Sequence, residues 1–383
     1  MKLSVHDILM RSGKIRVNLS DDFLMHLKGI ILESNGSLKI FSKKNNIPYK
    51  TFQNWLKGNR GIVYQKLNYF CEILGIDLRK HFSDIEYFYC GRKNSKVELK
   101  PQIEIDENLF FEGIGLYIGE GQKKKTTNEI ALSNTNPNVL KFHLRWLRGL
   151  FGVDLAKVTF FIYTPTKEFN SNQLKERWSK LLGIKKESIK NIYYYKKSTM
   201  ECVLVIYNKA VLRYLIDTIL EDSRPKILEK IEYSEAFIRG ILAGEGCVCI
   251  NKNKKVHHVQ MGMKDSRDVK LFCDSLKNVG IDFTIKQGNH CIVVTISRKT
   301  NIEKLISFGG FGSHDKRNIL LNHALTLFSQ RQTRRNGAKS FYLGIISGNP
   351  GCTSRKLSSL TGRSISRTRA ILKHLNKMDL FQM

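Results

Sequence analysis

The sequence lacks the features that would place it among zinc-ribbon, disulfide-rich or membrane proteins. Its eight cysteines include no Cys-x-x-Cys pair, so zinc-ribbon and disulfide-framework interpretations have little support. No apolar run approaches the roughly 18–20 residues of a membrane-spanning helix, and no signal-peptide pattern opens the sequence. We therefore expect a reduced, cytoplasmic protein without a membrane partner.

Acidic residues are scarce relative to basic ones. Lys and Arg total 64 against 34 Asp and Glu, which gives a formal net charge of +30. Such an excess attracts polyanions, and nucleic acid is the commonest of these. Thermophilic proteins raise glutamate together with lysine, and this sequence does not. Nucleic-acid binding is the favoured interpretation, in a protein whose 383 residues suggest about two to four domains.

One short segment of the sequence occurs twice. The copies are Gly113-Ile-Gly-Leu-Tyr-Ile-Gly-Glu-Gly121 and Ile238-Arg-Gly-Ile-Leu-Ala-Gly-Glu-Gly246. Each is an apolar stretch that ends in Glu-Gly, so Glu120 and Glu245 occupy the same place in the two copies. The pattern predicts a duplicated helix that ends in a carboxylate.

Glycines within these helices predict how the helices pack. Gly115 and Gly119 lie four residues apart, as do Gly240 and Gly244. Glycine costs about 1 kcal/mol in a helix relative to alanine, so two in each helix call for a reason. Residues four apart share one face of a helix, and a face without side chains lets two backbones approach closely. We expect the two helices to pack along these glycines.

Such packing would bring Glu120 and Glu245 together at the negative ends of two helix dipoles, where their charges repel. A divalent cation removes this repulsion, and hard oxygen ligands suit Mg²⁺ or Mn²⁺. The spacing therefore predicts a metal site for phosphodiester hydrolysis. The alternative is that both acids cap loops or pair with nearby lysines.

The order helix-strand-strand-helix-strand-strand-helix follows twice along the central region, and the first copy has an extra helix at about 172–182. We expect an α+β core with a helical unit before it and a second DNA-binding unit after it. The predicted segments are 1–90 (all-α, helix-turn-helix), 91–106 (linker), 107–230 (first repeat), 231–330 (second repeat) and 337–383 (winged-helix-like).

Two flanking segments have helix-turn-helix spacing. In residues 36–58 the second helix, about Tyr49–Lys57, would present a polar face to a major groove, although an ordinary helical hairpin has the same pattern. In residues 351–378 a second helix carries basic residues that can meet phosphate, and a wing is short or absent. The predicted DNA contacts are Lys50, Thr51, Gln53 and Asn54 in the first segment and Arg367, Arg369 and Lys373 in the second.

The duplicated motif, with the strands and helix that follow it, resembles the LAGLIDADG family of homing endonucleases. The resemblance covers about 220 residues, and it implies a pseudo-twofold saddle of two four-stranded antiparallel sheets on double-stranded DNA. It also implies metal ligation at Glu120, Glu245, Gly119 and Gly244. The sequence does not begin or end like an intein, so we expect a free-standing or intron-encoded protein. Two repeats in one chain imply a pseudo-dimeric core, so we expect a monomer.

The resemblance implies further catalytic residues. By spacing, Asn134 and Lys264 fall at the end of the second strand of each repeat, where family members organise the catalytic water. An Asn can only hydrogen-bond, whereas a Lys adds charge, so equal cleavage of the two strands is in question. The family's later basic position has three candidates, Lys226, Lys316 and Arg317.

A basic loop precedes the second strand of each repeat, and we expect both loops to contact DNA. They contain Lys123, Lys124 and Lys125 in the first repeat and Lys252, Lys254 and Lys255 in the second.

Three functions compete at this stage. The first is a site-specific, metal-dependent DNA endonuclease, and it explains why both motif copies keep their acid. The second is a DNA-binding transcription regulator on the same core, which the flanking helix-turn-helix units favour. The third is an RNA role of the kind that assists intron splicing. The paired acids favour the enzyme.

Overall fold

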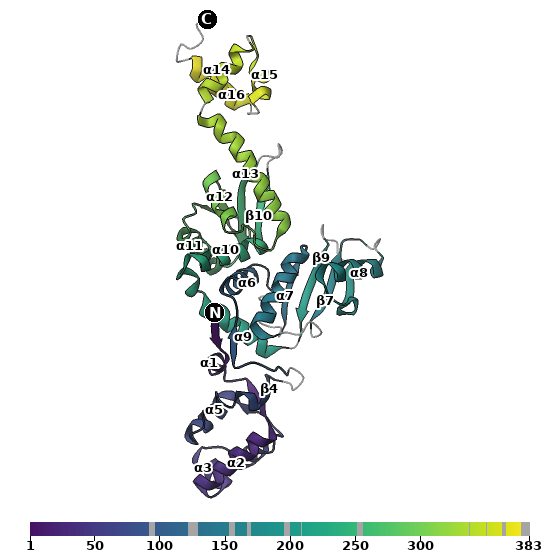
Figure 1. The fold of residues 1–383 in the computed structure, drawn as a ribbon, viewed down its shortest axis with the longest axis vertical. Helices are drawn as coiled ribbons and strands as arrows, with labels where there is room; N and C mark the ends of the chain where they lie inside the picture. Colours follow the sequence, from purple (N-terminus) through teal and green to yellow (C-terminus); the bar gives the residue numbers. More distant parts are fainter. Residues whose placement is uncertain are drawn as a thin grey trace.

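The computed structural model describes residues 1–383 except 92–95, 122–128, 153–157, 167–169, 195–199, 208, 251–255, 337, 350, 362–364 and 377–383. It is an elongated α+β structure, with an N-terminal unit at one end, the C-terminal helices at the other and two sheet-bearing repeats between them (Figure 1). In the described part of the chain, no helix is both long and apolar enough to cross a membrane.

The N-terminal unit combines helices with a small sheet, so the all-α prediction for residues 1–90 is wrong. Its strands pair in the order β3-β2-β4. In β2, Val17 and Leu19 are buried and alternate with half-buried Arg16 and Asn18, which is the period of a strand. The elements are α1 (Val5–Leu9), β2 (Arg16–Leu19), α2 (Asp21–Asn35), α3 (Leu38–Lys44), α4 (Tyr49–Leu56), β3 (Ile62–Val63), α5 (Tyr64–Ile73) and β4 (Ile85–Tyr89).

Part of the predicted linker is ordered as a strand. β5 (Gln102–Glu104) pairs antiparallel with β1 (Lys2–Ser4) at the start of the chain. The N-terminal amine of Met1 donates a hydrogen bond to the carbonyl of Ile105 at 2.8 Å. The first residues of the chain are thereby fixed next to the start of the first motif helix.

The first repeat differs from the predicted sheet. Its strands pair in the order β6-β9-β7-β8, and β7 runs parallel to β8. Parallel neighbours need a crossover between them, and α8, the extra helix of the prediction, lies between these strands in the chain. The elements are α6 (Glu107–Glu120), β6 (Ile130–Asn134), α7 (Pro137–Phe151), β7 (Thr159–Thr164), α8 (Ser171–Leu182), β8 (Ile189–Tyr194), β9 (Glu201–Ile206) and α9 (Ala210–Ser223).

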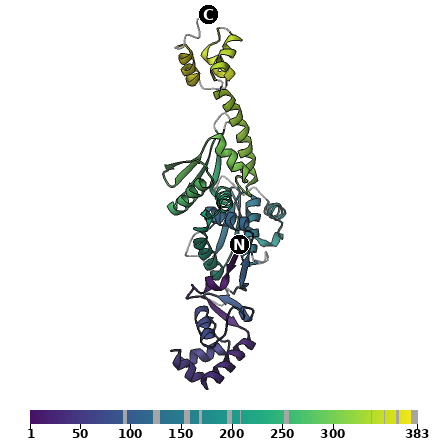
Figure 2. The same cartoon turned by 60° about the vertical axis from the view of Figure 1, so that its left-hand side comes forward.

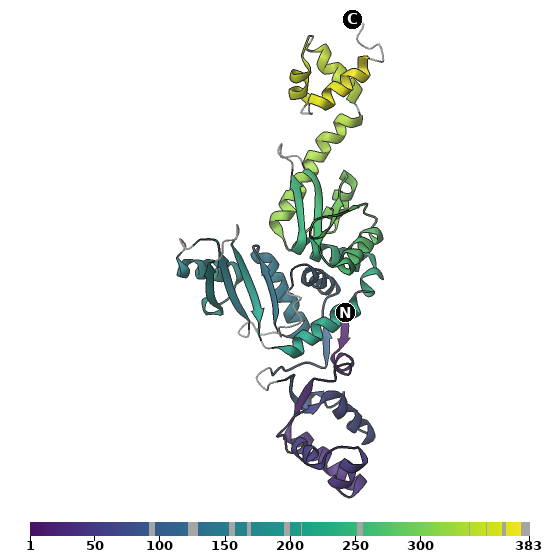
Figure 3. The ribbon, with the colours of Figure 1, turned by 180° about the vertical axis from the view of Figure 1, so that it is seen from behind.

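The second repeat has the predicted four-stranded antiparallel sheet, in the order β10-β11-β13-β12. The two sheets lie on either side of the motif helices (Figure 3). A short 3-10 turn, Lys226–Leu228, leads into this repeat. The elements are α10 (Ile231–Glu245), β10 (Gly246–Ile250), β11 (Val256–Met263), α11 (Ser266–Asn278), β12 (Thr284–Gln287), β13 (Ile292–Ile296) and α12 (Lys299–Ser307).

Beyond the second repeat, α13 (Asp315–Asn336) extends to the C-terminal helices α14 (Ala338–Ser347), α15 (Ser354–Thr361) and α16 (Ile365–Asn376) (Figure 2). The hydroxyl of Tyr342 lies 3.3 Å from that of Thr361 and 3.4 Å from that of Thr368, so these three buried residues join the C-terminal helices. The segment predicted to hold a wing lies outside the described residues.

An aromatic cluster packs behind the first motif helix. His143 of α7 stacks on Tyr117 of α6 with ring centroids 5.8 Å apart, and Trp146 lies 5.5 Å from the same imidazole. His143 is fully buried, and neither ring nitrogen has a hydrogen-bond partner among the described residues. Burial lowers its pKa to about 3, so the imidazole is neutral in the folded protein.

His143 predicts an acid-sensitive fold. The unfolded imidazole takes up a proton near pH 6.5, whereas the folded one resists protonation down to about pH 3. Stability is therefore complete above pH 6.5 and falls as the pH drops toward 3. Between pH 7.5 and 5 the unfolding free energy should fall by about 2 kcal/mol through this group. Urea unfolding of wild type and His143→Phe at both pH values checks this, because the variant should lose about 2 kcal/mol less. Equal losses in the two proteins would contradict it.

Candidate metal centre at the ends of the motif helices

The two motif helices pack backbone to backbone through their first glycines. A Cβ added at Gly240 would lie 2.0 Å from the carbonyl oxygen of Glu112, and one at Gly115 would lie 2.3 Å from that of Phe237. No side chain fits at either position without moving a helix. The close approach predicted from the glycine spacing is confirmed for this pair.

The second glycines of each motif lie against the glutamates of the opposite helix. A Cβ added at Gly244 would lie 2.9 Å from Cγ of Glu120, and one at Gly119 would lie 3.5 Å from Cγ of Glu245. Each glutamate side chain therefore crosses the end of the other helix. Glu120 is half-buried and Glu245 is exposed, so the pair lies at a surface that a solute can reach.

Asn134, the last residue of β6, joins this site. Its side-chain amide donates a hydrogen bond to Oε1 of Glu120 at 3.3 Å, and its Oδ1 accepts one from the backbone of Asn136 at 2.8 Å. Asn134 is buried. The structure thus brings together Asn134 and Glu120, two residues that the sequence placed in one catalytic group.

Lys264 does not occupy the corresponding place in the second repeat. In the first repeat Gly121 pairs with Leu132, two residues before Asn134. In the second repeat Gly246 pairs with Met261, so the residue two further along β11 is Met263. Met263 is buried, whereas Lys264 is exposed. The spacing match between Lys264 and Asn134 is therefore wrong by one residue, because β11 ends at Met263, which is the counterpart of Asn134 in the strand pairing.

Arg317, near the start of α13, binds the acid-bearing end of the second motif helix. Its Nη1 donates hydrogen bonds to the carbonyls of Leu242, Ala243 and Gly244 at 3.0, 2.9 and 2.9 Å. Cations favour the negative end of a helix dipole. Burial lowers the pKa of Arg317, while the nearby Glu120 carboxylate, followed by Cys247 and Glu245, raises it; a guanidinium stays charged in proteins.

Side chains from the loop before α13 and its first turn link the two repeats beside this centre. Asn136, which caps α7, contacts Nδ1 of His314 at 3.1 Å and donates a hydrogen bond to Asp315. Between the motif helices, Nε of Arg239 on α10 lies 2.7 Å from the carboxylate of Glu112 on α6, and both side chains are largely buried. The spacing of the sequence gave no sign of these contacts, because their partners lie more than a hundred residues apart.

The carboxylates of Glu120 and Glu245 fit a hard divalent cation, because each crosses the end of the opposite motif helix and oxygen donors suit Mg²⁺. Among the described residues, no group of three or more His, Cys, Asp or Glu could hold a metal. A cation here would therefore complete its coordination with water or phosphate, as Mg²⁺ commonly does. Of the two predicted backbone ligands, the Gly244 carbonyl already accepts a hydrogen bond from Arg317.

Some of the predicted DNA-contacting residues lie in the described part of the chain. On α4, Lys50 is exposed, and Thr51, Gln53 and Asn54 are half-buried. On α16, Arg369 and Lys373 are exposed. The remaining predicted contacts, Lys123, Lys124, Lys125, Lys252, Lys254, Lys255 and the side chain of Arg367, lie outside the described residues.

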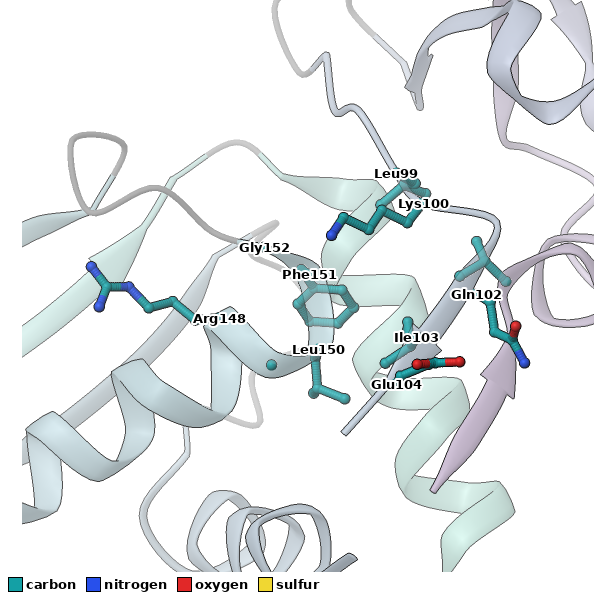
Figure 4. A pocket seen from close by; sticks show the side chains of 11 residues that line it. Leu99, Lys100, Gln102, Ile103, Glu104, Arg148, Leu150, Phe151 and Gly152 are labelled. Atoms are coloured by element: carbon teal, nitrogen blue, oxygen red, sulfur yellow. The ribbon is translucent and has the colours of Figure 1, made fainter. Parts of the chain in front are cut away.

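A pocket elsewhere in the chain belongs to the linker rather than to the motif. It has a volume of about 260 Å³ and lies between the end of α7 and the strand β5 (Figure 4). Its lining includes Arg148, Phe151 and Ile103. Neither Glu120 nor Glu245 contributes to it.

The fold is similar to several solved structures. Full-length DUF199/WhiA from Thermatoga maritima matches with a TM-score of 0.35 and 12% identity over 72% of this chain and 94% of its own. I-DmoI in complex with DNA and Mn matches with a TM-score of 0.30 and 19% identity, covering 54% of this chain and 98% of its own. The homing endonuclease I-WcaI bound to its DNA recognition sequence matches with a TM-score of 0.36 and 10% identity, over 56% and 86%.

No protein-family model matches the sequence, and no curated protein matches it. The structural neighbours are LAGLIDADG homing endonucleases and a LAGLIDADG-containing WhiA protein. All three superpositions score low, so the function proposed for this chain rests on its own carboxylate pair and the residues around that pair.

Proposed function

We propose that this protein is a site-specific, divalent-metal-dependent endonuclease for double-stranded DNA. The observation that carries the proposal is the placement of Glu120 and Glu245, each crossing the end of the opposite motif helix. Two carboxylates held together at an accessible surface repel each other, and a bound cation removes that cost. A DNA regulator has no need for such a pair.

Glu120 and Glu245 would hold Mg²⁺ or Mn²⁺. The bound ion supplies Lewis-acid stabilisation of the phosphate and lowers the pKa of a coordinated water. Asn134 holds the Glu120 carboxylate through its amide, and the Arg317 guanidinium fixes the end of α10 that carries Glu245. The net charge of +30 attracts the DNA, and the exposed Lys50, Arg369 and Lys373 can meet its backbone.

A DNA-binding regulator is the second candidate. The helical pair α3 and α4 and the helices α15 and α16 flank the core, and a saddle that reads a long site alone would not need them. Selection of bound duplexes from a random pool, followed by incubation with and without Mg²⁺, separates the two functions. Cutting that depends on Mg²⁺ supports the endonuclease, and binding without cutting in Mg²⁺ or Mn²⁺ supports the regulator.

Binding to the selected duplex should weaken steeply with salt. Each neutralised phosphate contributes about −0.9 to the slope of log affinity against log salt, so about six contacts give a slope near −5. Fluorescence anisotropy between low and moderate KCl concentrations measures this slope. A flat response would mean that the excess of basic residues serves something other than DNA.

A further inference from the structure

Two cysteines lie side by side at the start of the second sheet. Cys247 and Cys249 are two residues apart on β10, so both side chains project from the same face of the strand. Their Sγ atoms are 3.6 Å apart, which brings the two sulfurs into direct contact. Cys247 is exposed and Cys249 is half-buried, so a small solute reaches the pair from the surface.

The backbone around this pair allows a disulfide. Residues two apart on a strand have Cα atoms about 6.4–6.8 Å apart, which is within the range of about 4.4–6.8 Å found in disulfides. The strand β10 lies at the edge of its sheet, where it pairs with β11 on one side, and this pairing shifts register directly after Cys249. A strand held on one side, with an irregular ladder, resists a local change of twist less than a regular central strand does.

The two thiols fit an oxidant better than a metal ion. Protein zinc sites use at least three side-chain ligands. In the part of the chain that the structure describes, no group of three His, Cys, Asp or Glu side chains could hold a metal. Two thiols in contact are sufficient for a two-electron oxidation, in which a disulfide forms through a sulfenic acid.

The same pair is linked to the candidate metal centre. Cys247 follows Glu245 by two residues, and Gly246 between them is the first residue of β10. Sγ of Cys249 donates a hydrogen bond to Oε1 of Gln260 on β11 at 3.3 Å. An S–S bond removes this hydrogen bond and draws the two cysteines together. The start of β10 must then shift, and the carboxylate of Glu245 moves with it.

We propose that Cys247 and Cys249 are a regulatory dithiol, which a hydroperoxide converts to a disulfide that weakens metal binding by Glu120 and Glu245. One thiol first attacks the O–O bond and becomes a sulfenic acid, and the rest of the peroxide leaves as water or an alcohol. The other thiol then attacks the sulfenic sulfur, so that the S–S bond forms and water leaves. Two protons and two electrons pass from the thiols to the peroxide. Only the effect on the metal rests on the proposed endonuclease function.

Limited oxidation followed by peptide mapping tests the dithiol. The full-length protein, reduced and then desalted, is treated with a small excess of hydrogen peroxide. We expect the peptide that contains β10 to lose two hydrogens. Cys247→Ser and Cys249→Ser should abolish this loss, whereas Cys352→Ser, at a half-buried cysteine of the C-terminal unit, should keep it. An unchanged wild-type peptide, or the same loss in either β10 variant, would overturn the proposal.

Binding of Mn²⁺ measures the effect on the metal centre. Titration followed by electron paramagnetic resonance should show about tenfold weaker binding after oxidation, a loss of about 1.4 kcal/mol. Reduction with dithiothreitol and desalting should restore the affinity, because exposed disulfides are readily reduced. Peroxide should leave the affinity of Cys247→Ser and Cys249→Ser unchanged. Equal affinities in reduced and oxidised wild type would overturn the effect on the metal. If the reduced protein binds no Mn²⁺, the metal centre itself fails, and the peptide map alone then supports or overturns the dithiol.

Discussion

Replacement of either motif glutamate is expected to remove double-strand cleavage while leaving DNA binding nearly intact. Glu120→Gln and Glu245→Gln keep the size of the side chain but remove the charge that holds a cation. A bound metal is worth several kcal/mol of transition-state stabilisation, so the rate of double-strand cleavage should fall by about a thousandfold or more. Affinity for the selected duplex should stay within about threefold, because less than about 1 kcal/mol of binding is at stake for a surface charge.

A carboxylate at the far end of the same helix provides the control. Glu107 lies 13 residues before Glu120 on α6, about 20 Å away along the helix axis, and pairs with Lys230 at 3.7 Å. Glu107→Gln removes the same charge from the same helix without touching Glu120 or Glu245. Its cleavage rate should match that of wild type. Wild-type rates in either motif variant would rule out the proposed metal ligands.

The largest expected effect on stability comes from the first glycine of the second motif. In Gly240→Ala the new methyl group would lie 2.0 Å from the Glu112 carbonyl oxygen and 2.6 Å from the Leu116 backbone nitrogen. Both are backbone atoms in a helix, so the helices must separate. Overpacking costs about 1–3 kcal/mol where side chains can move, and a backbone clash should cost about 3 kcal/mol or more.

Gly119→Ala is the matched control for this substitution. The nearest atoms to its new Cβ would be 3.5 Å away, which is ordinary van der Waals contact. Alanine also favours the helix by about 1 kcal/mol relative to glycine. Thermal and urea unfolding should therefore show a large loss for Gly240→Ala and little change for Gly119→Ala. Equal losses in the two variants would mean that the helices do not pack as described.

The sequence was most informative where one local rule determined the structure. Glycines four residues apart on an apolar helix specify close packing, and the spacing placed Glu120 and Glu245 at adjoining helix ends. The close packing depends on residues within one or two helical turns and on the repetition of the motif. The antiparallel sheet of the second repeat, in contrast, was expected only from the family resemblance.

Features that depend on register or on distant partners could not be predicted in this way. Spacing alone matched Lys264 to Asn134, whereas the pairing of Gly246 with Met261 makes Met263 the counterpart of Asn134. The N-terminal strands are two to five residues long, too short for a clear period. Arg317 was one of three candidates for a basic position, and its contact with the end of α10 depends on tertiary packing.

The most direct test of the metal site is anomalous diffraction from crystals of the protein bound to its selected duplex and soaked in Mn²⁺. A cation held by the two motif glutamates should give an anomalous peak about 2.0–2.6 Å from carboxylate oxygens of Glu120 or Glu245, the range of hard-cation ligand distances. Manganese bound only at other acidic residues, with both motif glutamates free of it, would contradict the assignment of this pair as a metal centre.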